Sequence, residues 1–435
     1  MQVNQVKSAI EQSDLEMAVS QPDAAVQARE KLQACKPEPL HMKGARIDMW
    51  VSLHEDIAEL EAEWRRFEKI ADCTVFQSFI WLSTWLRHIG RRKETRCVIS
   101  TGRDEKGDLM FVLPLAVEWH GLSRTLTWLG SDNNDYNAPL FARHCPQWTR
   151  EDFLELWQHI LRRVQSVQGW RYDLVELVRM PAALGTRNNP FLYLPVHPHP
   201  DHAYLTRLGS DWETYYAGKR SAATRSRERT KRNRLGELGT IAFFTPRNPE
   251  EIGASVDQLI AQKTLAFAGM GARNIFQRPG WAAFYRDLAS NPDAAGFAHT
   301  SRLDVGSTAS AINLGLIFQG TYHHLLASHT EEVMARFSPG AVHLQELMRY
   351  AISQGCAAYD FTIGDEPYKR DWSEVQSVLF DHVSAVGVRG MPLAPAIRLQ
   401  SRMKRFIKQT PAVWSAFVRW RARLASLRPS PTAQP

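Results

Sequence analysis

The chain has 435 residues, of which 44% are hydrophobic and 23% charged, and its 53 Lys and Arg against 46 Asp and Glu leave a net charge of +7. This composition excludes a disordered or fibrous chain, and the length exceeds one typical core, so we expect two globular domains with tails. No signal-peptide pattern and no uncharged run of about 18 apolar residues is present, which argues against a membrane span. The five cysteines are scattered without a C-x-x-C pair. We therefore expect a cytoplasmic protein in a reducing compartment.

Residues 1–44 are rich in Gln, Ala, Glu and Lys, and this composition predicts a mobile tail with at most one helix, near Ala24–Ala34. A first domain is expected over residues 45–196. It begins with a strand at Arg46–Leu53 and a helix at His54–Ala71, whose apolar residues fall on one face. An aromatic helix follows over Val75–Gly90, and its aromatic stripe is typical of core packing.

A hairpin comes next in the first domain, with strands at Cys97–Gly102 and Leu109–Trp119. The strand after it opens onto Ser131–Phe141, which is dense in Asn and Asp. Such a stretch is usually a solvated turn. The alternative is the wall of a polar pocket, with Asp135 and Tyr136 as substrate-binding residues.

A capping-box pattern at Thr149 and Asp152 predicts a helix over Glu151–Val167, and the strand Trp170–Met180 follows it. The stretch Asn188–Leu205 then holds four prolines and reads as a linker between domains. Its alternate histidines could suggest a metal, but no fourth ligand stands at a known spacing, so we expect no metal site.

The second domain is expected over residues 197–390. Ser210 and Glu213 form a capping-box pattern before the basic stretch Lys219–Arg234. This stretch is either a solvated helix face or a cationic surface for phosphate groups. The remaining elements are expected as a strand at Ile241–Pro246, helices at Glu250–Ala266 and Trp281–Ser290, a strand at Ala298–Val305 and a hairpin over Ser310–Thr330 that turns at Gln319 and Gly320.

The segment that closes this hairpin carries the most informative pattern of the chain. Ser338 suits an N-cap, Pro339 the first helical position and Gly355 the helix stop, so a helix lies between them. The run Ala357–Ile363 then reads as a buried strand parallel to the one before the helix. In such a crossover unit, ligands bind at the helix N-terminus and at the strand ends.

The C-terminal tail, residues 391–435, is cationic. No acidic residue follows Asp381, and the mixture of Lys, Arg and aromatic residues predicts two short amphipathic helices broken at Pro411. Two interpretations stay open: contact with an anionic membrane surface, at the inner face of the membrane, or an arm packed on its own domain.

Several motifs together resemble the CelD/BcsL-like acetyltransferases, a bacterial branch of the GNAT superfamily related to the FemAB peptidyltransferases. The specific ones are the turn in ARFSPGAVHL and the block YDFTIGDEPYKRDW; looser matches are FQSFIWLSTWLRHIG, LGSDNNDY and SDWETYYAGKRS. The resemblance covers about Met49 to Asp381. It implies an α/β fold (an α+β mixed sheet) of two tandem GNAT-like domains, with acetyl-CoA or another acyl-CoA as co-substrate.

The resemblance also implies a site in the second domain. Acyl-CoA phosphates would lie on the helix N-terminus, although the turn departs from the usual R/Q-x-x-G-x-G/A signature. The expected catalytic residues are His329, Asp360 and Tyr368; the expected cofactor-binding residues are Arg336, Ser338, Gly340, Ala341 and Lys369; and Asp365 and Glu366 join Asp135 and Tyr136 as substrate-binding residues.

The function that we expect is acyl transfer to an amine or hydroxyl of an envelope or exopolysaccharide precursor, related to cellulose or polysaccharide biosynthesis. Two alternatives remain. One is a FemAB-like transferase that uses aminoacyl-tRNA, which the basic stretch favours, although nucleic acid is the less expected partner. The other is a catalytically inert GNAT-like scaffold that docks to a membrane-bound synthase through the cationic tail.

Overall fold

The computed structural model describes residues 36–42, 47–121, 123–330, 333–410 and 412–413. The helix predicted at Ala24–Ala34 and most of the second tail helix lie outside this part. Within residues 1–44, which we predicted as a mobile tail, a strand forms at Glu38–Met42 and pairs with the next strand. The prediction is wrong there, because Leu40 offers an apolar side chain that becomes buried in the core.

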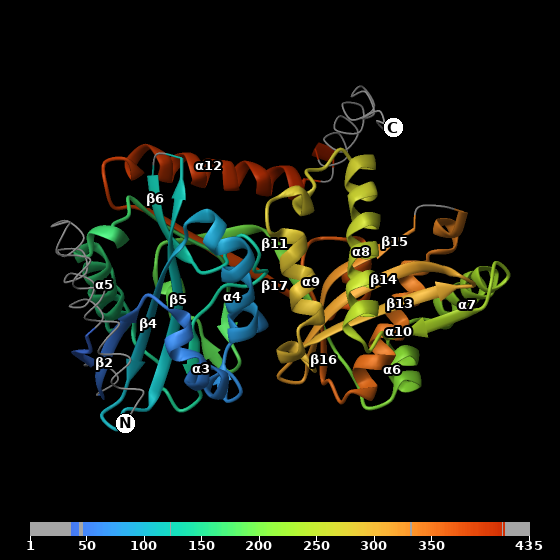
Figure 1. The fold of residues 1–435 in the computed structure, drawn as a ribbon, viewed down its shortest axis with the longest axis horizontal. Helices are drawn as coiled ribbons and strands as arrows, with labels where there is room; N and C mark the ends of the chain where they lie inside the picture. Colours follow the sequence, from blue (N-terminus) through green and yellow to red (C-terminus); the bar gives the residue numbers. More distant parts are fainter. Residues whose placement is uncertain (1–35, 43–46, 122, 331–332, 411, 414–435) are drawn as a thin grey trace.

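Fifteen strands of the described chain form one continuous mixed sheet, which runs through the whole molecule (Figure 1). Two short strands, β3 (Ala71–Asp72) and β7 (Leu140–Ala142), lie off its main path. The main path has the order β1 (Glu38–Met42), β2 (Ile47–His54), β4 (Arg96–Arg103), β5 (Leu109–His120), β6 (Ser123–Trp128), β8 (Leu174–Pro181), β17 (Val375–Ala385), β11 (Val196–Arg207), β16 (Ala358–Ile363), β15 (Thr321–His329), β14 (Thr308–Phe318), β13 (Ala298–Val305) and β12 (Ile241–Phe244).

The same order of elements occurs twice in this sheet. From β2 to β6 the strands form an antiparallel meander, and β8 then pairs in parallel with β6 after the helix α5 (Arg150–Ser166). From β12 to β15 a second meander follows, and β16 pairs in parallel with β15 after α10 (Pro339–Ser353). We call the part from β2 to β8 the first unit and the part from β12 to β16 the second unit. The expected mixed α/β fold is confirmed.

Strand β17 joins the two units, since it lies between β8 and β11 and is antiparallel to both. Its residues belong to the range that we assigned to the second domain. We predicted a linker over Asn188–Leu205. This prediction is wrong, because β11 occupies the second half of the stretch at the middle of the sheet. A register shift between Pro198 and His202 takes Pro200 out of the ladder with β17, and a bulge of this kind is where a sheet tolerates proline.

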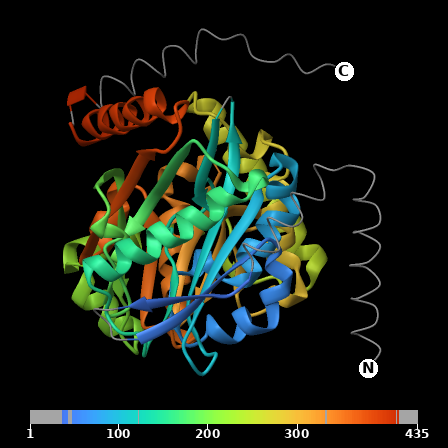
Figure 2. The same cartoon turned by 90° about the vertical axis from the view of Figure 1, so that its left-hand side faces the viewer.

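The helices cover the sheet, and two views show them around both units (Figures 1 and 2). The predicted helix at His54–Ala71 is shorter than expected: a 3-10 turn precedes it, and its last residue is already in β3. The segment Pro367–Trp372, predicted as a loop, forms a short helix with proline at its first position. The helices are α3 (Glu61–Phe67), α4 (Phe79–Trp85), α6 (Trp212–Lys219), α7 (Ala222–Gly236), α8 (Pro249–Gly269), α9 (Trp281–Ser290), α11 (Pro367–Trp372) and α12 (Gly390–Gln409).

Local cap chemistry sets several of these helix boundaries. Thr149 and Asp152 form the predicted capping box of α5. For α6 the predicted cap was one residue early, because the side chain of Asp211, and not that of Ser210, accepts from the Thr214 backbone N–H. Ser338 holds the N-cap position of α10 in a left-handed conformation, with φ of 57°, and its side chain makes no cap hydrogen bond.

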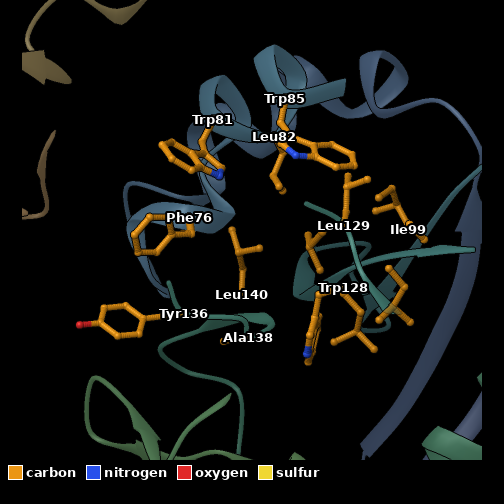
Figure 3. Close-up of a cluster of buried hydrophobic side chains, with 14 of the residues drawn as sticks. Phe76, Trp81, Leu82, Trp85, Ile99, Trp128, Leu129, Tyr136, Ala138 and Leu140 are labelled. Carbon is orange, nitrogen blue, oxygen red and sulfur yellow. The ribbon is translucent and has the colours of Figure 1, made fainter. Parts of the chain in front are cut away.

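The largest core cluster belongs mainly to the first unit and is rich in tryptophan. Figure 3 shows Trp81, Trp85 and Trp128 converging with aliphatic side chains, and the ring of Tyr136 lies beside Phe76. The three tryptophans are fully buried. The aromatic stripe at 75–90 is therefore core, as predicted, although the segment divides into a 3-10 turn, an α-helix and a π-turn.

Helix α12 lies across one end of the molecule and packs against β11 and β17 (Figure 1). It is the first of the two helices predicted in the tail: it ends at Gln409, before the predicted break at Pro411, but with 20 residues and Pro395 inside it, it is longer than expected. For this segment the arm packed on its own domain is the interpretation that the structure shows. No helix in the described part of the chain is long and apolar enough to cross a membrane.

Candidate active site

The two parallel strands of the second unit separate part-way along their length. β15 and β16 pair only from Thr321 to His323 against Ala358 to Asp360, although β15 continues to His329. Thr362 has a φ of 60°, a left-handed conformation that turns β16 away from its neighbour. A gap therefore opens between the strands on the side where α10 begins.

A cavity of about 920 Å³ occupies this gap. That volume lies within the range of about 300 to 1,000 Å³ that is typical of small-molecule sites. Its walls come from β15, β16, α7, α8, α10 and α11 of the second half of the chain, and from a single residue of the first unit, Asp135. The cavity thus lies where the crossover pattern predicted a ligand, and the first unit contributes to it.

One end of the cavity is the N-terminus of α10. The predicted residues Ser338, Gly340 and Ala341 line it. Lys231 of α7 reaches the same point, where its Nζ donates to Ser338 Oγ at 3.2 Å. Helix-end donors and a nearby ammonium group favour an anion here. Arg336, also predicted at this end, does not line the cavity, since its guanidinium stacks over the Phe337 ring at 4.8 Å.

The middle of the cavity is more apolar and is covered by α8. Phe267 of α8, Met270 directly after this helix, and Leu325 and Ala327 of β15 line this part. Polar side chains lie among them, since Gln262, Lys263 and Ser328 also line the cavity. The Lys263 Nζ donates to the Ala327 carbonyl oxygen at 3.1 Å, and burial lowers the pKa of its ammonium group.

Acidic and hydroxyl groups gather at the other end of the cavity. Burial raises the pKa of Asp135, although Arg179 and Lys369 act in the opposite direction. The Lys369 Nζ donates to the Ile363 carbonyl oxygen at 2.7 Å and lies 3.1 Å from a Glu366 carboxylate oxygen. Burial also raises the pKa of the Tyr368 hydroxyl, so it stays protonated near neutral pH. The predicted residues Asp135, Glu366, Tyr368 and Lys369 all line the cavity.

The predicted catalytic residues His329 and Asp360 do not come together. The ring of His329 lies at the N-terminus of α10, where a Cβ atom on Gly340 would be 3.3 Å from its Cδ2. Asp360 lies outside the cavity wall: its carboxylate accepts from the Tyr136 hydroxyl at 2.8 Å and from the Thr362 backbone N–H at 2.7 Å. His323 approaches the other oxygen to 3.3 Å.

Two predicted substrate-binding residues are likewise engaged elsewhere. Tyr136 is buried against the first-unit core, and its hydroxyl points away from that core toward Asp360 (Figure 3). Asp365 accepts from the Tyr204 hydroxyl at 2.8 Å and lies 3.0 Å from His202 Nδ1. Neither residue lines the cavity. Both instead hold the sheet and its connections in place beside it.

Sequence reasoning missed several polar cavity residues, among them Lys263, His324 and Thr362. Burial lowers the pKa of His324 to about 3, so this ring is neutral and can accept a proton in its hydrogen bond with the Tyr359 hydroxyl at 2.7 Å. The His323–His324 pair was visible in the sequence, but only the strand register shows which ring faces the cavity. Nothing in the helical pattern of α8 singled out Lys263.

Metal ligands do not cluster in the part of the chain that the structure describes. The histidines of the former linker pair with carboxylates instead: His199 lies 2.9 Å from Asp381, and His202 contacts Asp365. Each of these contacts joins β11 to an adjacent segment, so the histidines serve the sheet.

Three comparisons bear on this geometry. Residues 222–370 match the family model of the acetyltransferase (GNAT) domain, and this range contains most of the cavity wall. A search of curated proteins finds no match. Among solved structures, FemX has a TM-score of 0.53 at 11% identity, over 79% of this chain and 98% of its own. A conserved protein from Bacteroides thetaiotaomicron scores 0.48 at 11% identity, over 77% and 99% of the two chains.

A tandem GNAT protein from the clavulanic acid biosynthesis pathway scores 0.43 at 11% identity, over 78% of this chain and 98% of its own. Of these three structures FemX alone exceeds a score of 0.5, so the fold comparison depends on FemX, and at 11% identity it concerns the fold alone. The narrower CelD/BcsL family is not part of these findings. The chain is a mixed α/β protein whose sheet repeats one order of strands in two units, and residues 222–370, which contain the second unit, match the acetyltransferase (GNAT) domain model.

Proposed function

We propose that the protein is an acyltransferase that moves an acyl group from acetyl-CoA, or another acyl-CoA, to an amine or hydroxyl of an envelope or exopolysaccharide precursor. The observation that carries this proposal is the cavity between the splayed strands, with a cationic helix end on one side and the half-buried carboxyl group of Asp135 on the other. The chemical gradient along the cavity matches the parts of an acyl-CoA.

The cationic end suits the phosphates of the donor. Lys231 and the N-terminus of α10 would hold them, and Arg220, which also lines the cavity, adds charge at the rim next to its partner Glu228. Each such charge interaction at a helix end contributes roughly 0.3 to 2 kcal/mol, which positions an anion more than it binds one. The apolar middle, with Phe267 and Leu325, suits the uncharged arm of the donor.

When bound, the acyl-CoA supplies an activated thioester, and the polar end of the cavity supplies proton transfer. Asp135 is the group best placed to take a proton from the attacking amine or hydroxyl, because it is half-buried, lines the cavity and has a raised pKa. Tyr368 is placed to give a proton to the departing sulfur. The proposed base is therefore Asp135, in place of His329 and Asp360, which we expected from the sequence.

Lys369 orients this end of the cavity. Its bond to the Ile363 carbonyl oxygen fixes the ammonium group beside β16, where it faces Asp135 and Glu366. A fixed ammonium group can hold the oxygens of a sugar or phosphate on the acceptor. The choice of a glycan precursor depends on the resemblance of the YDFTIGDEPYKRDW block to CelD/BcsL-like acetyltransferases, and this block forms β16 and α11.

Transfer from aminoacyl-tRNA is the second candidate, and α7 favours it. This helix is basic, contains a single acidic residue and exposes Arg227, Arg229 and Arg234 next to the cavity end marked by Lys231. Such a surface suits a polyanion larger than the phosphates of acyl-CoA. A catalytically inert scaffold is the third possibility, and binding measurements separate all three.

Calorimetric titration of the full chain with acetyl-CoA tests the donor. We expect binding in the micromolar range, and its loss in Gly340→Glu, because the new carboxylate would stand at the phosphate end against His329. Gly218→Glu is the matched control, since a side chain at Gly218 meets open space and should leave binding intact. If wild-type protein binds no acyl-CoA but binds charged tRNA, the second candidate replaces the first; if it binds neither, the scaffold interpretation does.

Asp135→Asn tests the proposed base. We expect kcat to fall by about 10² to 10³, because the amide cannot accept the proton. In wild-type protein the rate should fall as the pH drops through the raised pKa of Asp135, and the variant should lack this acidic limb. An unchanged pH profile in the variant would contradict the assignment.

A further inference from the structure

Helix α12 has two faces, and only one of them is covered. The covered face places Ala394 and Ile397 against Leu174 of β8 and Val383 of β17. Arg398 strengthens this contact, because its Nε donates to the Val383 carbonyl oxygen at 3.1 Å. These residues hold the helix across the end of the sheet, as Figure 1 shows.

The opposite face of α12 is apolar and open. Leu399 is 60% exposed, Met403 56% and Phe406 64%, and their spacing of four and three residues places them in one stripe. Met391, at 64% exposure, extends the stripe toward the start of the helix, since each step of four residues stays on one side. Single exposed apolar residues are common on protein surfaces, but a continuous stripe marks an interaction surface.

The charge of α12 indicates what this face contacts. Between Gly390 and Gln409 the helix has basic residues and no acidic one. Arg402 and Lys404 are exposed and make no ion pair among the described residues, whereas Lys408 pairs with Asp201 at 2.5 Å. An apolar stripe with flanking cations is the pattern of helices that lie in the interface of an anionic bilayer.

Two neighbouring features extend the same end of the molecule. Val388, 80% exposed, stands in the turn before α12. Trp119, 47% exposed near the end of β5, is paired with Arg124 of β6. Asp173 connects β6 with the turn before α12, because its backbone N–H donates to the Arg124 carbonyl oxygen and its own carbonyl oxygen accepts from the Val386 N–H. Both views show α12 at one end of the molecule (Figures 1 and 2).

We propose that the outward face of α12 is a docking surface for an anionic lipid bilayer. The stripe of Leu399, Met403 and Phe406 enters the boundary between headgroups and acyl chains, and Arg402 and Lys404 contact the anionic headgroups. The protein body then stands on the membrane with this end of its sheet downward. The proposal is independent of the chemistry in the cavity, which α12 does not line.

Co-sedimentation of the full chain with vesicles tests the proposal. Vesicles of phosphatidylcholine with 30% phosphatidylglycerol should pellet the protein, and pure phosphatidylcholine vesicles or about 0.5 M salt should weaken this binding several-fold. The variant Leu399→Ser/Met403→Ser/Phe406→Ser should lose at least tenfold in partitioning. The control Ile70→Ser/Leu265→Ser replaces apolar side chains that are equally exposed elsewhere, and should bind like wild-type protein.

Three results would overturn the proposal. The first is failure of wild-type protein to bind anionic vesicles, and the second is full binding by the triple variant with an unchanged melting temperature. The third is a wild-type dimer that the triple variant converts to a monomer without lipid, because a second copy would then cover the stripe. Light scattering after size exclusion measures that last outcome. Arg402→Gln/Lys404→Gln should reduce binding to anionic vesicles alone, and an equal loss on neutral vesicles would count against the headgroup contact.

Discussion

The two units of the sheet share one backbone feature, but they differ in what occupies the space that this feature creates. In each, two parallel strands pair briefly and then separate: Thr125 and Leu126 with Leu174 and Val175 in the first unit, and a three-residue ladder in the second. Each final strand has one non-glycine residue in a left-handed conformation, Arg179 with φ of 57° and Thr362 with φ of 60°. The backbone opening is therefore repeated.

What fills the opening differs. In the first unit, the loop after β6 closes it: Asn137 bonds to the carbonyl oxygens of Val178 and Arg179, and Trp128 packs against Phe191. In the second unit the space is a cavity of about 920 Å³. The same loop of the first unit then sends Asp135 into that cavity. The opening of the first unit is thus packed and supplies a polar group, whereas the opening of the second unit is a cavity, which we propose as the donor site.

Filling the second opening should have the largest effect. In Ala327→Trp the indole would enter the apolar middle of the cavity, and we expect acyltransfer to fall by more than 10³, with little change in melting temperature. Ala242→Trp, on the exposed edge strand β12, is the control of equal size. Activity assays with circular dichroism check this, and an active Ala327→Trp protein would mean that the donor binds elsewhere.

Removing the side chain of Trp128, which packs in the opening of the first unit, should have the next largest effect. This effect should be on stability and not on activity. Trp128 is 1% exposed, so Trp128→Ala should lower the free energy of unfolding by about 3 to 5 kcal/mol. Trp50→Ala, at a partly exposed site on β2, should cost far less. Denaturant titration measures both, and similar values for the two variants would contradict a packed first opening.

Glu118 is a buried acidic residue of the first unit. Its pKa is raised like that of Asp135, but we expect its titration to affect stability and not catalysis. Burial raises the pKa of Glu118 to about 7, mainly by desolvation. Because this folded-state pKa exceeds the unfolded value, stability is full below about pH 4.5 and falls as the pH rises toward 7, by up to about 3 kcal/mol. Glu118→Gln should remove this loss, whereas Glu105→Gln, in an exposed turn, should not. Unfolding titrations between pH 5 and 8 decide, and a wild-type curve without this fall would refute it.

The smallest effect should come from Tyr368→Phe. Loss of the hydroxyl removes the proposed proton donor but leaves the ring packed on Phe361, so kcat should fall roughly tenfold with little change in KM. Tyr193→Phe, outside the cavity, is the control and should leave kcat and KM unchanged. An acceptor-independent loss of acetyl-CoA binding in Tyr368→Phe would instead assign the hydroxyl to donor binding.

Local chemistry was readable from the sequence, and long-range placement was not. The helix from Pro339 to Ser353 and the turn at Gln319 and Gly320 were predicted, because proline, glycine and left-handed residues act within a few positions. The two units are not identical in register, since Tyr359 and Asp360 lie within the parallel ladder of the second unit, whereas Tyr172 and Asp173 precede the ladder of the first unit. The repeat itself is present in the strand order.

The site was predictable at the helix end and in the segment directly after β16, where Glu366, Tyr368 and Lys369 line the cavity, because those residues are neighbours in one crossover unit. It was not predictable at Lys263, whose role depends on the way α8 packs on β15. Asp360 was misplaced for the same reason: strand direction alone does not tell which side chain faces the cavity and which faces the first unit. His329, in contrast, does line the cavity at the helix end. Asp135 was predicted only as one of two readings of a polar loop.

The position of β17 has a consequence for the order of synthesis. This strand, at Val375–Ala385, supplies the neighbour that β8 needs, yet it is made about two hundred residues after β8. The first unit therefore leaves the ribosome with an open strand edge, and it can be sealed only when the second unit has nearly emerged. An exposed edge of this kind invites pairing with other nascent chains. Folding of this protein is accordingly expected to finish after translation and to be sensitive to loss of its C-terminal part.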